Sequence, residues 1–228
     1  MKYDNITPAV FINRPNRFIA DVEINGKRET VHVKNTGRCR ELLLPGTRVF
    51  LTAPGSPGRK TKYDLVSVLK NGKALINIDS QAPNRVVMEW LETKGFTKII
   101  PEYTYGDSRI DFYMEKILPS GETIRYLTEV KGCTLEINGM GYFPDAPTKR
   151  GTKHLRELIK AVKEGYRSCI VFVIQMEGVF EVKPNTDTDP DFAKAFEDAK
   201  NQGVEILFLP CSVESDSISV NTEQSLNI

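Results

Sequence analysis

The stretch Ser108-Arg109-Ile110-Asp111-Phe112, which is followed after the turn residues Pro119-Ser120-Gly121-Glu122 by Glu129-Val130-Lys131, decides the fold of this chain. The runs from Ser108 to Met114 and from Thr123 to Val130 predict two strands joined as a hairpin. Glu129 and Lys131 are two residues apart in a strand, so their side chains face one side of the sheet and Val130 faces the other. Pairing of the strands would bring the carboxylates of Asp111 and Glu129 together with one ammonium group.

Metal-assisted cleavage of phosphodiesters uses such a cluster. Carboxylates bind Mg²⁺ or Mn²⁺, the metal lowers the pKa of a bound water, and a cation orients that water or neutralises charge in the transition state. A Glu-x-Lys pattern alone is common on solvent-facing strands. Here the apolar neighbours Leu127, Val130 and Cys133 favour a metal site at Asp111 and Glu129, with solvated surface charges as the alternative.

Predicted helices and strands on both sides of the hairpin form a mixed α/β layer domain, which we place at residues 81–211. A strand from Lys98 to Tyr105 makes the hairpin a meander, and the continuous apolar run from Cys169 to Ile174 is typical of a central strand. The remaining predicted elements are a helix through Val86, Val87, Trp90 and Leu91, helices from Thr152 to Lys163 and from Asp189 to Asn201, and a strand from Val204 to Leu209. Residues 212–228 are rich in Ser, Asn and acids, and we expect this tail to be flexible.

The first 80 residues have a different organisation, with short strands separated by turns. Asn25-Gly26 lies between two strand-like runs and is a strong hairpin signal. Further strands are predicted at Arg48 to Thr52, Tyr63 to Leu69 and Ala74 to Ile78. About five short strands in this length fit a small β-barrel of the oligonucleotide-binding (OB) type. An SH3-like barrel is the alternative.

The net charge of +1 conceals two modules of opposite sign. Residues 1–80 contain 14 Lys and Arg against 7 Asp and Glu, whereas residues 81–228 contain 17 against 23. A basic first module suits a polyanion, and an acidic second module suits metal-binding or structural carboxylates. Chance clustering on solvated faces is the alternative.

The cysteines and the apolar runs limit the class of protein further. Cys39, Cys133, Cys169 and Cys211 form no Cys-x-x-Cys pair, so we expect reduced, buried thiols in place of disulfides or a structural zinc site. The apolar runs are far shorter than the roughly 20 residues of a membrane helix, and the N-terminus has no apolar signal region. We therefore expect a soluble protein of the cytoplasm without a membrane partner.

Two levels of resemblance follow from the motifs. Asp111 followed by Glu129-Val130-Lys131 resembles the signature of the PD-(D/E)XK nucleases, although Ile110 stands where the motif has proline. The chain also resembles the sugar fermentation stimulation protein A (SfsA) family over nearly its whole length. The strings that carry this second resemblance are Asn35-Thr36-Gly37-Arg38-Cys39-Arg40-Glu41-Leu42, Ser108-Arg109-Ile110-Asp111-Phe112, Glu129-Val130-Lys131-Gly132-Cys133-Thr134-Leu135 and residues 143–155.

The resemblance implies an N-terminal OB-like domain, a nuclease-like second domain, DNA binding and a part in regulating sugar metabolism, notably of maltose. By position it makes Asp111 and Glu129 the metal carboxylates and Lys131 the lysine of the nuclease signature, with Mg²⁺ or Mn²⁺ as the cofactor.

Four other residues are candidates for the same chemistry. Glu102 on the preceding strand and Glu89 on the first helix are possible third carboxylates, with surface charges as the alternative. Gln175 ends the strand expected beside that of Glu129, where its amide can orient a water or a phosphate, or simply end the strand. His154 is a candidate for proton transfer, with a structural hydrogen bond as the alternative.

The predicted nucleic-acid contacts are cations beside turns and at a helix N-terminus, where backbone amides attract phosphate. They are Lys149, Arg150 and Lys153 in the second module and Lys34, Arg38, Arg40, Arg59, Lys60 and Lys62 in the first. Thr148 or Thr152 is expected to cap the helix or to donate to phosphate. An alternative for Arg38 and Arg40 is that they bridge the two modules.

Three functional hypotheses follow. The leading one is a DNA-binding protein that cleaves phosphodiesters with the help of Mg²⁺. The second is a DNA-binding transcriptional regulator that keeps the fold without cleaving, and the third is an adaptor whose basic module binds an acidic protein. The strand form of the nucleic acid, RNA as an alternative to DNA, and the oligomeric state stay open.

Overall fold

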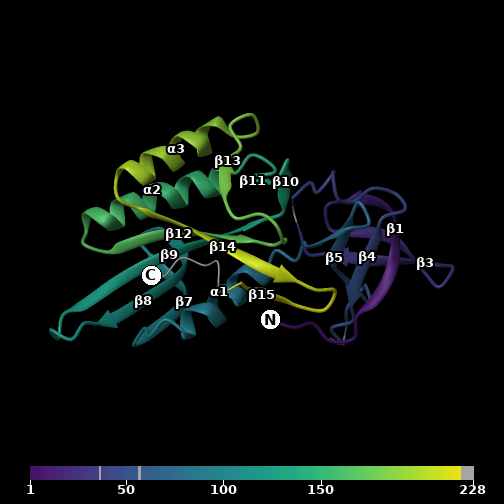
Figure 1. Ribbon diagram of the computed structural model, residues 1–228, viewed down its shortest axis with the longest axis horizontal. Helices are drawn as coiled ribbons and strands as arrows, with labels where there is room; N and C mark the ends of the chain where they lie inside the picture. Colours follow the sequence, from purple (N-terminus) through teal and green to yellow (C-terminus); the bar gives the residue numbers. More distant parts are fainter. Residues whose placement is uncertain (36, 56–57, 222–228) are drawn as a thin grey trace.

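The computed structural model describes residues 1–35, 37–55 and 58–221. Two units lie side by side, a barrel at one end of the molecule and a larger layered domain at the other (Figure 1). The N-terminal residues lie between them. Across the described residues, no helix combines the length and apolar character that crossing a membrane requires.

The first unit is a closed barrel of five strands, as predicted. Neighbouring strands are antiparallel in the order β3-β2-β1-β4-β5, and a parallel pairing of His32 with Asp64 and of Val33 with Leu65 closes the barrel. The predicted hairpin at Asn25-Gly26 is confirmed, because both residues adopt the positive φ that this two-residue turn requires. The strands are β1 (Thr7–Asn16), β2 (Ile19–Ile24), β3 (Lys27–Val33), β4 (Arg48–Thr52) and β5 (Asp64–Lys70), and β6 (Ala74–Asn77) continues the sheet beyond β5.

The second unit is a mixed six-stranded sheet in the order β15-β14-β12-β9-β8-β7. Its three inner strands β9, β12 and β14 are parallel, and antiparallel strands flank them on both sides. Strand β12 is central, as its apolar run predicts. The bounds are β7 (Lys98–Tyr105), β8 (Ser108–Ile117), β9 (Thr123–Cys133), β12 (Arg167–Ile174), β14 (Glu205–Val213) and β15 (Ile218–Val220).

Helices cover both faces of this sheet (Figure 1). Helix α1 (Ala82–Glu92) packs against one face, while α2 (Lys149–Lys163) packs against the other. Helix α3 (Pro190–Asn201) packs on α2, and its Phe196 ring also contacts Phe172 of β12. Helix α2 begins three residues earlier than predicted, because the Thr148 hydroxyl accepts a hydrogen bond from the Gly151 amide and caps the helix there. Asp189 caps α3 in the same way, through the Phe192 amide.

A small second sheet has no counterpart in the sequence prediction. It consists of β10 (Leu135–Ile137), β11 (Met140–Phe143) and β13 (Val182–Pro184), in that order. These strands have only three or four residues, too few for a recognisable alternation of apolar and polar side chains. The sheet borders the site described below, because β10 continues the chain directly after β9.

The flexible tail predicted from residue 212 is wrong as far as residue 221. Ser212 and Val213 belong to β14, and Ile218 is fully buried in β15. The N-terminus holds this strand: the Ile218 amide donates to the Met1 carbonyl at 3.0 Å. Residues 222–228 lie outside the described residues. The prediction failed because two buried apolar residues, Val213 and Ile218, are hard to recognise in a segment rich in serine and acids.

All four cysteines are free and buried, as expected. Burial raises the pKa of the Cys39, Cys133, Cys169 and Cys211 thiols to about 12. Their thiolate fraction near neutral pH is therefore very small, which makes them poor nucleophiles and poor metal ligands.

Candidate metal and nucleic-acid site

Asp111 lies where strands β8 and β9 separate. The ladder between them runs from Ile117 paired with Thr123 to Phe112 paired with Thr128, and ends there. Beyond this point the Asp111 carboxylate replaces the backbone of β8 as the partner of β9, because its Oδ2 accepts a hydrogen bond from the Val130 amide at 2.8 Å. Asn84 of α1 donates to Oδ1 at 2.8 Å. Both oxygens of Asp111 are thus fixed by the protein.

Glu129 and Lys131 face the same side of the sheet, as their spacing predicts. Glu129 is only 1% exposed, and its Oε1 accepts hydrogen bonds from Lys131 Nζ and His154 Nδ1. Its second oxygen, Oε2, is buried and has no hydrogen-bond partner among the described residues. A buried carboxylate oxygen without a partner is costly, so this atom indicates a ligand that the protein itself does not supply.

His154 acts on Glu129 through a defined tautomer. Arg150 Nε donates to His154 Nε2 at 3.3 Å, and an arginine can only donate. The ring proton therefore sits on Nδ1, from which it is donated to Glu129 Oε1. His154 is buried and orients the Glu129 carboxylate. This is the structural hydrogen bond that we gave as the alternative to proton transfer.

The two carboxylates have opposite electrostatic environments. Burial, together with the negative charge of Glu129, raises the pKa of Asp111 above its ordinary value. Burial alone would also raise the pKa of Glu129, but Lys131 and His154 outweigh it and hold this pKa below the usual range. Glu129 is therefore the anion that the protein stabilises, whereas Asp111 gains most from an additional positive charge nearby.

These groups line a cavity of about 400 Å³, referred to below as the central cavity. Both units contribute to its wall. The barrel side supplies Asn35, Gly37 and Ser80, and the second unit supplies Asp111, Glu129, Lys131, Tyr142, Asp145, Arg150 and Gln175 among others. The predicted convergence of Asp111, Glu129 and Lys131 is present in the structure.

Gln175 joins the two units at the edge of this cavity. Its Nε2 donates to the Asn77 carbonyl at 3.0 Å, to Asn77 Oδ1 at 2.9 Å and to the Asp79 carbonyl at 3.1 Å. The amide nitrogen is therefore engaged by the barrel. Its Oε1 lies beside Gly132 in the wall of the cavity, and the predicted role of Gln175 toward a water or phosphate stays a prediction for that oxygen.

Gly132 is required by this close packing. A Cβ at this position would lie 2.2 Å from Gln175 Oε1 and 2.8 Å from Pro83 Cγ. We expect Gly132→Ala to lower the free energy of unfolding by about 1–3 kcal/mol, because the strand and the interface between the units must shift. Urea denaturation measures this, with Ser212→Ala, at an exposed position of β14, as a control. An unchanged Gly132→Ala midpoint would contradict the tight contact.

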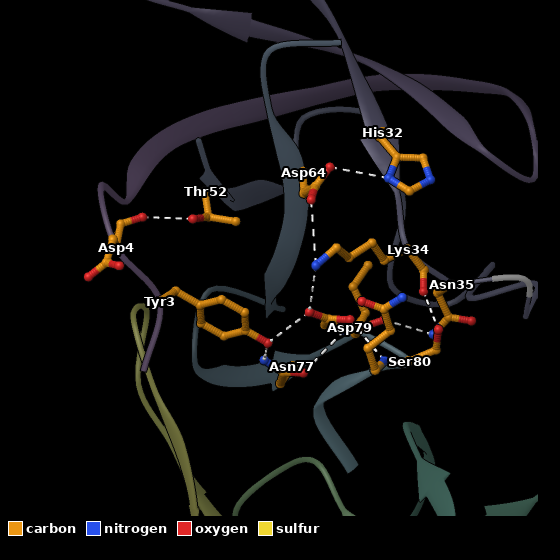
Figure 2. A network of polar contacts seen from close by, with 12 residues as sticks. Tyr3, Asp4, His32, Lys34, Asn35, Thr52, Asp64, Asn77, Asp79 and Ser80 are labelled. Carbon is orange, nitrogen blue, oxygen red and sulfur yellow. Dashed lines mark hydrogen bonds and ion pairs between the residues drawn. The ribbon is translucent and has the colours of Figure 1, made fainter. Parts of the chain in front are cut away.

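The partly buried Lys34 lies between two aspartates (Figure 2). Its Nζ is 3.5 Å from Asp64 Oδ2 and 3.3 Å from Asp79 Oδ2, and both carboxylates are almost completely buried. The Tyr3 hydroxyl donates to Asp79 at 3.3 Å, and burial followed by the charge of Asp79 raises the pKa of Tyr3. The Lys34 ammonium thus compensates two buried acids, and its predicted contact with nucleic acid stays a prediction.

Arg38 and Arg40 lie at a second hollow of about 750 Å³, the barrel-side hollow, which adjoins the central cavity. Sequence analysis missed two other arginines there, Arg14 and Arg17. Arg14 fixes the loop before Arg38 by donating to the Asn35, Gly37 and Arg38 carbonyls. The Arg38 amide in turn donates to Asp145 Oδ2 of the second unit at 2.9 Å, so this loop bridges the units as well as lining the hollow.

The other predicted cations are more scattered. Arg150 lines the central cavity, whereas Lys149 and Lys153 are exposed on α2, and Lys153 Nζ donates to the Asp107 carbonyl at 3.0 Å. In the loop after β4, Arg59 pairs with Asp64, while Lys60 and Lys62 are exposed. Their contacts with nucleic acid stay predictions.

Neither candidate third carboxylate lines the central cavity. Glu102 is exposed and pairs with Arg109, and Glu89 pairs with the N-terminal ammonium at 2.6 Å. Among the described residues, no three His, Cys, Asp or Glu side chains are arranged to hold a metal ion. A metal at this site would thus have two side-chain carboxylates, Asp111 and Glu129.

Sequence reasoning also missed Asn84 and Asp145. The residues around Asn84 do not predict its contact with Asp111, because this contact depends on α1 lying beside the end of β8. Asp145, between two prolines, was noted as part of a loop, but its approach to Gly37 depends on how the units dock. A Cβ on Gly37 would overlap Asp145 Oδ2 and lie 2.8 Å from Asn35 Oδ1, so glycine is needed at this joint.

A closed five-stranded barrel joined to a mixed sheet with Asp111, Glu129 and Lys131 at its edge defines an OB domain followed by a restriction endonuclease-like domain. Two family profiles match accordingly. The SfsA N-terminal OB domain matches residues 12–78, and the sugar fermentation stimulation protein RE domain matches residues 81–217. The chain belongs to the SfsA family.

Relatives match over nearly the whole chain. A sugar fermentation stimulation protein homolog of Desulfitobacterium hafniense (strain Y51) is 53% identical over 221 residues, covering 96% of this chain and 94% of the relative. One from Clostridium beijerinckii is 50% identical, with 96% of each covered. The solved structure of Pyrococcus furiosus SfsA in complex with Ca²⁺ has a TM-score of 0.84 at 31% identity and covers 97% of this chain and 95% of its own.

Proposed function

We propose that this protein is a metal-dependent phosphodiesterase that binds and cleaves nucleic acid. The observation that carries the proposal is the convergence of Asp111, Glu129 and Lys131 on one cavity, together with the buried, unpartnered Glu129 Oε2. Arginines beside the cavity supply positive charge for a polyanion. A role in sugar metabolism stays a prediction.

The carboxylates suit a divalent cation. Asp111 and Glu129 are hard oxygen donors, and Mg²⁺ is commonly held by one or two carboxylates with water and phosphate oxygens as its other ligands. Glu129 Oε2 has no competing hydrogen bond among the described residues. The P. furiosus relative is described in complex with Ca²⁺, which also binds oxygen ligands and supports a cation here. When bound, the cation would polarise the phosphate and favour ionisation of the attacking water.

The remaining chemistry belongs to side chains of this chain. Lys131 holds a fixed positive charge beside Glu129, where it offsets negative charge that develops on the phosphate. Asn84 and the Val130 amide orient Asp111, and His154 orients Glu129. Arg150 supports His154 and lines the cavity, so it is placed to contact the phosphate backbone as well.

Asp111→Asn tests the proposal. We expect the wild-type protein to cleave labelled DNA or RNA in the presence of Mg²⁺ or Mn²⁺, and we expect EDTA to abolish this cleavage. The variant should lose about 3 kcal/mol of transition-state stabilisation, roughly a hundredfold in rate, because the cation loses one of its two charged ligands. Gel-based cleavage assays measure the rate, and Asp198→Asn, exposed on α3, is the matched control.

Two outcomes would overturn the proposal. Salt-dependent binding of DNA without cleavage in any metal would indicate a regulator that keeps the fold without catalysis. No affinity for DNA or RNA would leave an adaptor whose basic patch binds an acidic protein.

A further inference from the structure

The central cavity is the middle section of a longer groove, and we propose that this groove takes a single strand of nucleic acid across both units. This inference rests on the proposed function and names the substrate form for the same site. The cavity shares Gly37, Phe143, Asp145 and Thr148 with the barrel-side hollow. On its other side it shares Asn84 and Asp111 with a further hollow of about 400 Å³, the helix-side hollow.

Arginines lie at both ends of the groove, and the catalytic carboxylates Asp111 and Glu129 lie at its centre. The barrel-side hollow is lined by Arg14, Arg17, Arg38 and Arg40. The helix-side hollow is lined by Arg85 and by Arg109, which is paired with Glu102 of the same hollow. Arg17, Arg38, Arg40 and Arg85 are exposed. Phosphates on either side of the cleaved bond can thus pair with arginines, while the bond itself lies beside Asp111 and Glu129.

The burial of the carboxylates excludes an intact duplex from the centre. Glu129 is 1% exposed, and the cavity of about 400 Å³ has the size of a small-ligand site. DNA in duplex form is stiff over about 50 nm, so its backbone resists the sharp bend that would bring a phosphate to these buried carboxylates. A single strand can make this bend, because its backbone bends at each nucleotide.

The groove also offers apolar surface that only unpaired bases can use. Tyr142 and Leu135 line the central cavity, and Met88 and Pro101 line the helix-side hollow. In a duplex the faces of the bases are stacked on one another. In a single strand they are free to stack on aromatic and apolar side chains, which is how proteins bind single strands with little sequence preference.

Contacts between the units fix the width of the groove. Besides the three hydrogen bonds of Gln175 Nε2, the Asn77 amide donates to the Gln175 carbonyl at 3.0 Å. Lys70 of β5 pairs with Glu136 of β10 at 2.5 Å. Widening the groove to admit a duplex would break these buried and partly buried contacts. The structure therefore favours a single strand over a duplex.

Fluorescence anisotropy with labelled oligonucleotides tests the strand form. In EDTA, which prevents cleavage, we expect single-stranded DNA or RNA to bind at least about tenfold more tightly than the corresponding duplexes. Comparing DNA with RNA identifies the preferred sugar. Arg17→Ala and Arg85→Ala, at opposite ends of the groove, should each weaken single-strand binding by about fivefold or more.

Arg28→Ala and Arg48→Ala are matched controls on barrel strands outside the groove, and both should bind like the wild type. Equal binding and cleavage of duplex and single strand would overturn the strand inference and leave the nuclease intact. So would groove variants that bind no worse than the controls. Single-strand binding that depends on Arg17 and Arg85 without cleavage in any metal would support the groove and overturn the proposed catalysis.

Discussion

Replacing Glu129 by glutamine is expected to abolish metal-dependent cleavage while leaving the protein folded. Glutamine keeps the shape of the side chain and an oxygen that can accept from Lys131 and His154. It removes the negative charge, and with it the ligand whose Oε2 has no hydrogen-bond partner among the described residues. Loss of several kcal/mol of transition-state stabilisation corresponds to a rate about 10²- to 10³-fold lower.

The decisive measurement is the single-turnover cleavage rate at saturating Mg²⁺, alongside the thermal unfolding midpoint. Glu115→Gln is the matched control, since Glu115 is also a strand carboxylate paired with a lysine, Lys98, but lies outside the central cavity. If Glu129→Gln cleaves at the wild-type rate, the reaction takes place elsewhere. If it unfolds, the comparison moves to Asp111→Asn.

The core of the site could be predicted from the sequence because its geometry is local. Strand periodicity puts Glu129 and Lys131 on one face, and a turn of ordinary composition brings Asp111 beside them. No step in this inference depends on how distant segments dock. The same is true of the Asn25-Gly26 hairpin and of the buried central strand β12.

Features that depend on docking could not be predicted. Gln175 was recognised as a strand-end amide, but its three contacts lie 96 and 98 residues away in the barrel. The sequence could not predict that Arg17 and Arg85 lie at opposite ends of one groove, because this groove forms only when both units have folded and docked. Strand β15 was missed for the same reason, since its partners are β14 and the N-terminus.

Lys34 shows which contacts a local pattern cannot reveal. Next to Asn35-Thr36-Gly37 and two arginines, its charge suggested a phosphate contact. Its ion-pair partners, Asp64 and Asp79, are 30 and 45 positions further along the chain, and Figure 2 shows the ammonium between them. The lysine is needed because β5 and the segment after β6 bring two buried acids close together.

Lys34→Met is therefore expected to lower the free energy of unfolding by about 3–5 kcal/mol, the usual cost of removing one partner from a buried ion pair. Methionine fills the space of the lysine stem but leaves Asp64 and Asp79, which are 0% and 1% exposed, without the shared cation. His32 and Arg59 still contact Asp64, so Asp79 bears most of the loss. Urea denaturation followed by fluorescence measures the change.

A second substitution distinguishes charge from packing. In the Lys34→Met background, Asp79→Asn removes the uncompensated acid, and we expect it to restore a substantial part of the lost stability. Lys60→Met, in the exposed loop before Asp64, is the matched control and should change the free energy of unfolding by less than about 0.5 kcal/mol. If Lys34→Met is as stable as this control but binds nucleic acid more weakly, the lysine is a phosphate contact after all, and the internal ion pair contributes little.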